Sequence, residues 1–392
     1  MANPVYIVSA VRTPMGSFLG SLSSVSATEL GSTAIRGALA AAGINGTDVQ
    51  EVFMGNVLQA GLGQAPARQA SMGAGIPDSV PCTTINKVCA SGMKSIALAS
   101  QSIALGEADI VVAGGMENMS QVPHYLSGRK ATKFGDLSAK DGMLLDGLTD
   151  VYNATHMGNC AELCAKEHGI TREAQDDFAI ASYEKSTKAW SAGEFDAEIV
   201  PVLVPQRKGD PLVVDCDEEF TQVKMDRIRG LRPAFQKDGT ITAANASTLN
   251  DGASALVLAS AAAVERMGLT PLARLVSSAD AAHQPEWFTT APAKAVPLAL
   301  KKAGWDTKDV DLWELNEAFA VVGLANVALL DLDPEKVNVN GGAVALGHPL
   351  GSSGSRIVVT LIHALRKRGL KKGAAAICNG GGGASAMTVE LT

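Results

Sequence analysis

Two cysteines, one histidine and one asparagine have the residue types and glycine-rich surroundings of a reactive site. Cys89 follows Asn86-Lys87-Val88 and precedes residues 95–105, a small, apolar run that predicts a buried helix. Backbone N–H groups and the positive dipole end at a helix start favour an anion, so we expect the pKa of this thiol to be lowered and Cys89 to be a nucleophile. On these residues alone, a small core cysteine opening a helix is an equal alternative.

His348 lies in Gly347-His348-Pro349, on a glycine-rich loop with little side-chain crowding. Histidine is the usual proton acceptor near neutral pH, which favours a role as general base. A solvent-exposed loop histidine without a chemical role is the alternative.

Cys378 ends an apolar run and is followed by Asn379 and four glycines, Gly380 to Gly383. Such glycines let a backbone approach a ligand closely and aim N–H groups at an oxyanion, although a flexible turn would have the same pattern. Asn316 follows a predicted strand, where it could cap a helix, hold a water or donate to an oxyanion. The set predicts acyl transfer through a thioester, in which one cysteine attacks, the histidine assists and the second cysteine moves a proton.

Composition limits the class of protein. The chain has 392 residues, 40 of them glycine, with 46% hydrophobic and 19% charged residues, which suits closely packed α/β layers in two or three domains or a duplicated fold. We expect no membrane segment because no apolar run reaches the ~20 residues needed to cross a bilayer, and the net charge of −7 argues against nucleic acid as a partner. The scattered cysteines and the absence of a secretory pattern favour the cytoplasm, or the mitochondrion if a transit peptide was removed.

Strand and helix patterns alternate twice along the chain. The first series predicts strands over 5–10, 49–57 and 109–113, helices over 28–42 and 95–105, and a closing Gly114-Gly115. After residue 271 the same order returns, with strands over 272–276, 309–315 and 374–378 and helices over 293–303 and 355–368. This alternation predicts parallel sheets with helices on their faces.

Local matches between the two series keep nearly the same offset, which predicts an α/β fold of two duplicated βαβαβ halves about a pseudo-two-fold axis. We assign residues 1–118 plus 250–271 to the N-terminal half and 272–392 to the C-terminal half. Residues 119–249 are richer in charge, glycine and proline, and predict an inserted loop domain for substrate binding or assembly.

Four motifs, in order and at matching separations, resemble the thiolase family over the whole chain: Asn86-Lys87-Val88-Cys89-Ala90-Ser91-Gly92, Asn316-Glu317-Ala318-Phe319, Gly347-His348-Pro349 and Cys378-Asn379-Gly380-Gly381-Gly382. The resemblance implies that the duplicated halves form a layered α-β-α-β-α core. It also implies that acetyl-CoA acetylates Cys89 while His348 takes the proton. Cys378 would then deprotonate a second acetyl-CoA, giving acetoacetyl-CoA and CoA in a reversible ping-pong reaction. One oxyanion hole would use His348 and a water held by Asn316, and the other the N–H groups of Cys89 and Gly380.

The resemblance also implies a CoA site and no cofactor required for the chemistry. The residues that contact CoA would be His156, Met157, Tyr183, Arg227, Ala243, Ser247, Phe288, Ala318 and Phe319. A potassium site would use Tyr183 and the backbone oxygens of Ala243, Ala244, Ala246 and Val344. The i, i+4 spacing of His156, Cys160 and Cys164 leaves a zinc site as an alternative, without a fourth ligand.

Within the family, Phe288 resembles a branch that handles 2-methylacetoacetyl-CoA, but Thr289 stands where that branch has proline, so branched substrates stay open. The resemblance further implies a homotetramer, a dimer of dimers, with residues 122–135 making the extra contacts. The alternatives are a ketoacyl-synthase relative, which would lack the second cysteine, and a non-catalytic module, which would lack at least one site residue.

Overall fold

The computed structural model describes residues 3–129 and 133–392. In these residues one mixed sheet has the strand order β14-β15-β16-β13-β1-β12-β5-β3-β4, with β2 (Gly16–Ser17) paired to β12. The strands of the first half are β1 (Val5–Arg12), β3 (Glu51–Gly55), β4 (Cys82–Ile85), β5 (Ile110–Asn118) and β12 (Asn250–Ser260). Those of the second half are β13 (Ala273–Ala282), β14 (Leu312–Leu315), β15 (Lys372–Asn379) and β16 (Gly383–Leu391).

The sheet has an internal two-fold arrangement. Its halves meet where residues 5–7 of β1 pair antiparallel with residues 273–275 of β13. Outward from this contact, β12, β5 and β3 are matched by β16, β15 and β14. The duplication predicted from the sequence is confirmed by this order of strands.

The expectation of parallel sheets is wrong for the middle of each half. Only β3–β4, β3–β5 and β14–β15 are parallel among the long pairs, whereas β12 and β16 run antiparallel to both of their neighbours. These two strands had no counterpart in the sequence prediction. Each returns along a neighbouring strand and so needs no crossover helix.

Gly114 and Gly115 lie inside β5, which continues to Asn118, so the prediction that they close the strand is wrong. A Cβ on Gly114 would overlap the carbonyl oxygen of Ser254, and one on Gly115 would overlap that of Gly351. The glycines therefore permit close packing of strand on strand and helix on strand, not a turn.

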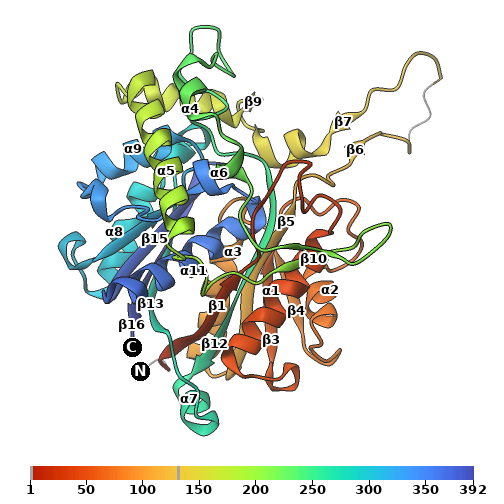
Figure 1. The fold of residues 1–392 in the computed structure, drawn as a ribbon, viewed down its shortest axis with the longest axis vertical. Helices are drawn as coiled ribbons and strands as arrows, with labels where there is room; N and C mark the ends of the chain where they lie inside the picture. The colour runs from red at the N-terminus through yellow and green to blue at the C-terminus, as the bar shows by residue number, and fades with distance from the viewer. Residues whose placement is uncertain (1–2, 130–132) are drawn as a thin grey trace.

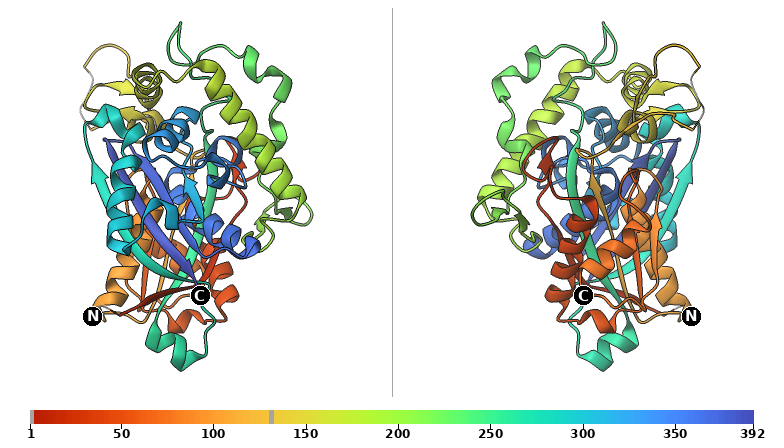
Figure 2. Two further views of the ribbon diagram at one scale, coloured as in Figure 1. Left: turned by 90° about the vertical axis from the view of Figure 1, so that its left-hand side faces the viewer. Right: turned by 90° about the vertical axis from the view of Figure 1, so that its right-hand side faces the viewer.

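Helices form three layers around the sheet halves, as Figures 1 and 2 show. Helices α1 (Ala27–Ala42) and α2 (Pro66–Gly73) cover the outer face of the first half, and α8 (Pro292–Ala303) covers that of the second. Between the halves lie α3 (Ser91–Leu105) and α11 (Leu350–Arg368), which contact each other and both halves. The layered α-β-α-β-α fold is confirmed.

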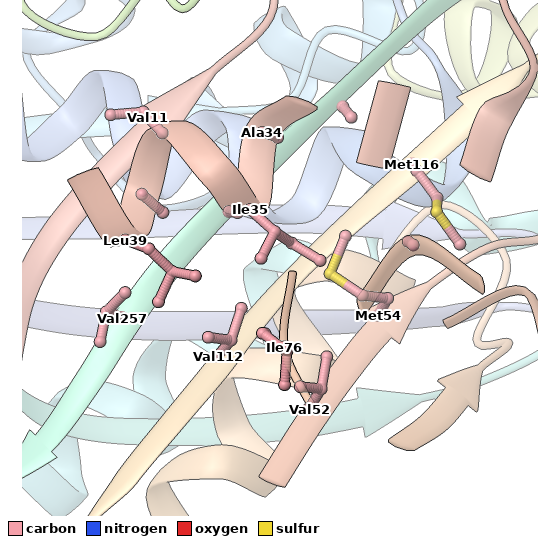
Figure 3. Close-up of a cluster of buried hydrophobic side chains, with 14 of the residues drawn as sticks. Val11, Ala34, Ile35, Leu39, Val52, Met54, Ile76, Val112, Met116 and Val257 are labelled. Atoms are coloured by element: carbon pink, nitrogen blue, oxygen red, sulfur yellow. The ribbon is translucent and has the colours of Figure 1, made fainter. Parts of the chain in front are cut away.

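Three apolar cores lie between these layers: one under α1, one around α3 and α11 that reaches both sheet halves, and one under α8. Between α1 and the first half, Ile35, Val52 and Val112 interdigitate with the other side chains drawn in Figure 3. Helix α1 starts at a capping box of Ser26 and Glu29 and ends at Gly43, whose φ of 66° is left-handed. These local signals are readable in the sequence, so the bounds of α1 agree with the prediction to within one residue.

Helix α11 begins at Leu350, five residues before the expected start, because its first turns are small residues that resemble a loop in the sequence. In the structure, a Cβ on Gly354 would press on the backbone of Met93 in α3. Small residues here let the N-terminal turns of the two central helices cross closely.

The inserted region stands over one end of the sheet and contributes α4 (Met157–Glu167) and α5 (Arg172–Ser191). Strands β6 (His124–Tyr125) and β7 (Lys140–Asp141) carry an arm that projects from the body (Figure 1). Of the segment expected to mediate assembly, residues 130–132 lie outside the described residues. The other elements are β8 (Thr149–Asp150), β9 (Thr155–His156), β10 (Val202–Val204), β11 (Leu212–Val214), α6 (Glu219–Gln222), α7 (Ala261–Met267), α9 (Ala320–Leu329) and α10 (Ala343–Leu346).

Across the described residues, no helix combines the length and the apolar character needed to cross a membrane.

Candidate active site

A mainly apolar pocket of about 530 Å³ lies where the inserted region meets the carboxyl ends of the sheet strands. It is lined by most of the residues singled out from the sequence, together with apolar neighbours: Cys89, His156, Met157, Ala243, Ala246, Ser247, Phe288, Ala318, Phe319, His348, Gly380, Met119, Met143, Leu148, Phe235, Leu249 and Leu350. Both halves of the fold and the insertion contribute side chains to this one space.

The loop that carries Cys89 is held by side-chain-to-backbone hydrogen bonds. Val88 has a left-handed φ of 48°, which is uncommon for a β-branched residue. The Val88 N–H donates to Asn86 Oδ1 at 3.0 Å, and the hydroxyl of Ser91 donates to the Val88 carbonyl and accepts the N–H of Lys87 at 2.8 Å. These bonds hold the loop in a shape that turns the sulfur of Cys89 toward the pocket.

An ion-pair cluster ties the same loop to the other half of the fold. Lys87 Nζ and Lys94 Nζ contact the two carboxylate oxygens of Asp280 on β13, and Ser385 Oγ on β16 donates to the same carboxylate at 2.6 Å. Because these groups are partly exposed, they add little to the stability of the fold. We assign the cluster a role in aligning the Cys89 loop with β13 and β16.

The expected lowering of the thiol pKa is wrong for the protein without substrate. Burial raises the pKa of Cys89 to about 11, and hydrogen bonds from the backbone N–H groups of Gly380 and of Cys89 itself oppose this rise only in part. Cys89 precedes the first helical residue, Ser91, by two positions, so desolvation outweighs the helix start. The thiol is therefore protonated at neutral pH and needs a base to react.

Alkylation of Cys89 by iodoacetamide in the absence of CoA is expected to become faster with pH up to about 11, because only the thiolate reacts. Rates from pH 6 to 11, with the modified residue identified by peptide mass spectrometry, test this. A plateau already reached near pH 8 would contradict the predicted protonation state.

His348 is buried, with 5% of its surface exposed, so the alternative of a solvent-exposed loop histidine is wrong. Its Nδ1 lies 2.6 Å from Ser353 Oγ, whose hydroxyl donates to the Pro349 carbonyl at 2.9 Å. Since that hydroxyl hydrogen is used, Nδ1 carries the ring proton and Nε2 is left as an acceptor. Nε2 has no hydrogen-bond partner among the described residues.

Burial, with a smaller contribution from the nearby charge of Arg356, lowers the pKa of His348 to about 3. The imidazole is therefore neutral across the physiological range and can accept a proton from a thiol. Its backbone N–H donates to Asn250 Oδ1 at 2.8 Å, and Gly347 before it has a φ of 104° that only glycine adopts readily.

Asn316 is not a helix cap, because α9 begins at Ala320 with Phe319 at its N-cap. Its backbone N–H donates to the Ala376 carbonyl at 2.9 Å, which extends the pairing of β14 with β15. Both polar atoms of its buried side chain lack partners among the described residues. An unpaired buried amide is costly, so the side chain is suited to hold a water or a ligand oxygen.

Cys378 lies near the end of β15 and is fully buried. Burial raises the pKa of this thiol well above its usual value, and the neighbouring Cys89 and Cys164 raise it further, whereas its own backbone N–H lowers it. The contribution of Cys89 to this shift indicates that the two thiols lie near each other. It packs beneath the pocket against Met157, Phe288 and Phe319.

Several expected CoA contacts have fixed positions in the pocket wall. His156 caps α4 by accepting the Gly158 N–H on Nδ1 at 2.9 Å, and its ring stacks on Phe235 with the centroids 4.6 Å apart. Ser247 Oγ donates to the Ala318 carbonyl at 2.9 Å. Of the expected residues, Arg227 is exposed and does not line the pocket.

Of the residues expected at the potassium site, Tyr183, Ala244 and Val344 pack in one apolar cluster, whereas Ala243 and Ala246 line the pocket. Burial raises the pKa of Tyr183, and the charges of Glu219 and Glu317 raise it further. In the zinc alternative, the described residues contain no group of three or more histidine, cysteine or acidic side chains placed to hold a metal.

Sequence reasoning missed Ser353 and Glu117. Ser353 lies in the run Ser352-Ser353-Gly354, where nothing in the residue types singles it out. Glu117 is more visible, as an acidic residue near the end of an otherwise apolar strand. Burial raises its pKa to about 7, against the backbone N–H groups of Val57, Leu58 and Gly351, which lower it.

Comparison with protein families gives two matches that together span nearly the whole chain. Residues 5–262 match the thiolase N-terminal domain, and residues 269–391 match the thiolase C-terminal domain.

Among curated proteins, the chain is 58% identical over 389 residues to a mitochondrial acetyl-CoA acetyltransferase of Bos taurus, covering 99% of this chain and 92% of that protein. It is 58% identical over 390 residues to acetyl-CoA acetyltransferase 2 of Arabidopsis thaliana, covering 99% and 97%. It is 55% identical over 394 residues to a cytosolic acetyl-CoA acetyltransferase of Gibberella zeae, covering 100% and 99%.

Among solved structures, the Acat5 thiolase of Ascaris suum in complex with coenzyme A superimposes with a TM-score of 0.94 at 48% sequence identity. The match covers 99% of this chain and 100% of that chain.

Proposed function

Because this chain belongs to the thiolase family, we propose that it is an acetyl-CoA C-acetyltransferase that condenses two acetyl-CoA molecules reversibly to acetoacetyl-CoA and CoA. The observation that carries this proposal is the pairing, in one pocket, of the Cys89 thiol with a neutral imidazole whose Nε2 is free to accept a proton. The names of relatives above half identity support the acetyl group as the one transferred.

In the first half-reaction, Cys89 Sγ attacks the thioester carbon of acetyl-CoA and its proton passes to His348 Nε2. The tetrahedral oxyanion accepts the N–H groups of Cys89 and Gly380, which already point at the sulfur in the free protein. Collapse breaks the bond to CoA, and the leaving thiolate takes the proton from His348. Each such N–H donor is worth about 10²–10³ in rate.

In the second half-reaction, Cys378 first gives its proton to His348 Nε2, and the resulting thiolate takes a proton from the methyl group of a second acetyl-CoA. The enolate oxygen is stabilised by this Nε2–H of His348 and by a water held on Asn316. In the described residues neither polar atom of the Asn316 side chain has a hydrogen-bond partner, which supports this role. The enolate carbon attacks the acetyl group on Cys89, the bond to Sγ breaks, and that sulfur takes the proton from His348, while Cys378 keeps the methyl proton. Enolate stabilisation carries much of this barrier because the methyl proton is weakly acidic.

The CoA chain is proposed to lie along the apolar side of the pocket, between the His156-Met157 pair and Ser247. Phe288, Ala318 and Phe319 would contact the pantetheine and acyl parts. Arg227 and Lys224, both exposed beyond the pocket, would meet the nucleotide phosphates. This assignment rests on the family and on the position of the pocket.

A potassium ion is also proposed, beside Tyr183. The donor set fits a hard cation, because it combines the phenol oxygen with the backbone oxygens of Ala243, Ala244, Ala246 and Val344, close to the charges of Glu219 and Glu317. When bound, the ion would hold the Val344 segment that precedes His348 against the CoA-binding segment.

Activity is expected to rise severalfold when potassium chloride replaces sodium chloride at constant ionic strength, and the Tyr183→Phe variant is expected to lose this response. Initial rates of thiolysis test both proteins, and the melting temperature gives a second readout of ion binding. A wild type equally active in both salts would contradict the proposed site.

The three-part division at residues 118, 249 and 271, the homotetramer and a cytoplasmic location are kept as proposals. Relatives carry both mitochondrial and cytosolic names, so the compartment is not carried over from them.

The direct test of function is incubation of the protein with acetoacetyl-CoA and CoA while the enolate absorbance is followed. Rapid loss of absorbance with formation of acetyl-CoA is expected. No turnover would contradict the proposal, and faster turnover of longer 3-ketoacyl-CoA substrates would contradict the preference for the acetyl group.

A further inference from the structure

A buried carboxylate behind the pocket takes no part in the mechanism above. Glu117 is fully buried near the end of β5 and accepts four hydrogen bonds. One oxygen accepts Asn56 Nδ2 at 2.7 Å and the Leu58 N–H at 3.1 Å. The other accepts the Val57 N–H at 3.0 Å and the Gly351 N–H at 2.8 Å. Four donors and two accepting oxygens suit the ionised form of this side chain.

These donors belong to the supports of both proposed reactive groups. Gly351 lies in the first turn of α11, three residues after His348, so its bond to Glu117 fixes the start of that helix. Its backbone also packs against Gly115 of β5, where no Cβ could fit. A shift of this turn would carry His348 with it.

The second connection leads to the nucleophile. Val57, held by Glu117 through its N–H, uses its carbonyl to accept Asn86 Nδ2 at 3.4 Å, and Asn86 in turn holds the N–H of Val88. Leu58 also packs in one apolar cluster with Cys89. The carboxylate therefore lies between the loop of Cys89 and the helix of His348.

The internal two-fold arrangement gives Glu117 an instructive counterpart. In each half, an asparagine directly follows the shorter parallel strand, and a polar residue lies two positions beyond the last paired residue of its neighbour. These positions hold Asn56 and Glu117 in the first half, and Asn316 and Cys378 in the second. In the proposed reaction, Asn316 and Cys378 act on the enolate and its proton. In the first half, Asn56 donates to Glu117, and Glu117 binds the start of α11, the central helix of the second half.

We propose that Glu117 is a positioning residue that holds Cys89 and His348 in register for acyl transfer. The inference rests on the proposed function, because it concerns the first half-reaction of that chemistry. A displacement of about 1 Å in such a pair can slow a reaction about 10²-fold, which sets the size of the expected effect.

The test is Glu117→Gln, which keeps the shape of the side chain. Each carboxylate oxygen accepts two N–H groups, so the new NH₂ must face two donors in either orientation. The matched control is Glu162→Gln on α4. Glu162 is also buried and accepts the N–H groups of Thr240 and Ile241, but in the described residues it has no hydrogen bond to the Cys89 loop or α11.

Single-turnover acetylation by acetyl-CoA, with saturating substrate, is expected to slow about 10²-fold in Glu117→Gln and less than threefold in Glu162→Gln. CoA affinity, measured by calorimetry, is expected to stay within threefold of wild type in both variants. Acetylation at the wild-type rate in Glu117→Gln would overturn the proposal, as would an equal loss in both variants.

If Glu117→Gln does not fold, Asn56→Ala removes one donor and leaves the charge, with an expected slowing of acetylation of about threefold to tenfold. An unchanged rate in that variant would overturn the proposal. Failure of the proposed function itself would be seen separately, as the absence of acetylation in the wild-type protein.

Discussion

A Cys378→Ala variant is expected to acetylate Cys89 but to form acetoacetyl-CoA about 10²–10⁴ times more slowly than wild type, the usual contribution of a positioned general base. The reason is geometric, because the thiol of Cys378 lies buried beside Cys89 but does not provide the nucleophile. Cys378 is not among the groups that shift the pKa of Cys89, so its removal gives the first half-reaction no cause to fail.

Two measurements separate the half-reactions of that variant. Intact-protein mass spectrometry after mixing with acetyl-CoA reports the acetyl-enzyme, and chromatography of CoA esters reports condensation. Cys82→Ala, which changes a partly exposed thiol at the far edge of the sheet, is the control and should behave as wild type. Condensation at the normal rate in Cys378→Ala would show that another group takes the methyl proton.

Replacement of Cys89 by alanine is expected to abolish the acetyl-enzyme and to lower thiolysis by about 10⁴-fold or more, since no other group can carry the acyl chain. CoA should still bind, because the pocket wall formed by His156, Met157 and Ser247 is unchanged. Retained CoA binding would show that the loss is chemical and not a failure to fold.

The same mass-spectrometric experiment, with calorimetry for CoA, checks this prediction. Cys216→Ala, a partly exposed thiol that does not line the pocket, is the matched control. Acetylation of the Cys89→Ala protein at any other cysteine with a normal rate would contradict the assignment of the nucleophile.

Residues with strong local signals allowed much of this fold to be predicted. The α1 helix has a capping box and a terminal glycine, and its predicted bounds agree with the structure. Strand β1, an apolar β-branched run, was also predicted, although it continues two residues further, to Arg12. The order of these elements was enough to predict the duplication, and the resemblance to the thiolase family added the layered core.

The missed features depend on contacts between distant segments. Strands β12 and β16 are rich in alanine and serine, and their pairing partners, not their own sequences, make them strands. Gly114 and Gly115 were interpreted as a turn, because a close approach of Ser254 and Gly351 leaves no local trace. Sequence patterns carry little information about such packing.

The candidate site shows the same difference between local signals, which the sequence reveals, and contacts between distant segments, which it does not. Cys89, His348 and Gly380 were expected together, and the structure brings them to one pocket. The protonation state of the thiol was not predictable, because it follows from burial among residues that both halves and the insertion contribute. Their roles in the reaction stay predictions for the variants above.

The two-fold arrangement of the sheet has an evolutionary consequence. Cys89 precedes α3 and His348 precedes α11, the two helices that occupy the centre of the fold. An assembly of two identical halves would place the same residue type at both starts, either two nucleophiles or two bases. Joining the halves in one chain freed each copy to change alone, so that one could specialise in attack and the other in proton transfer.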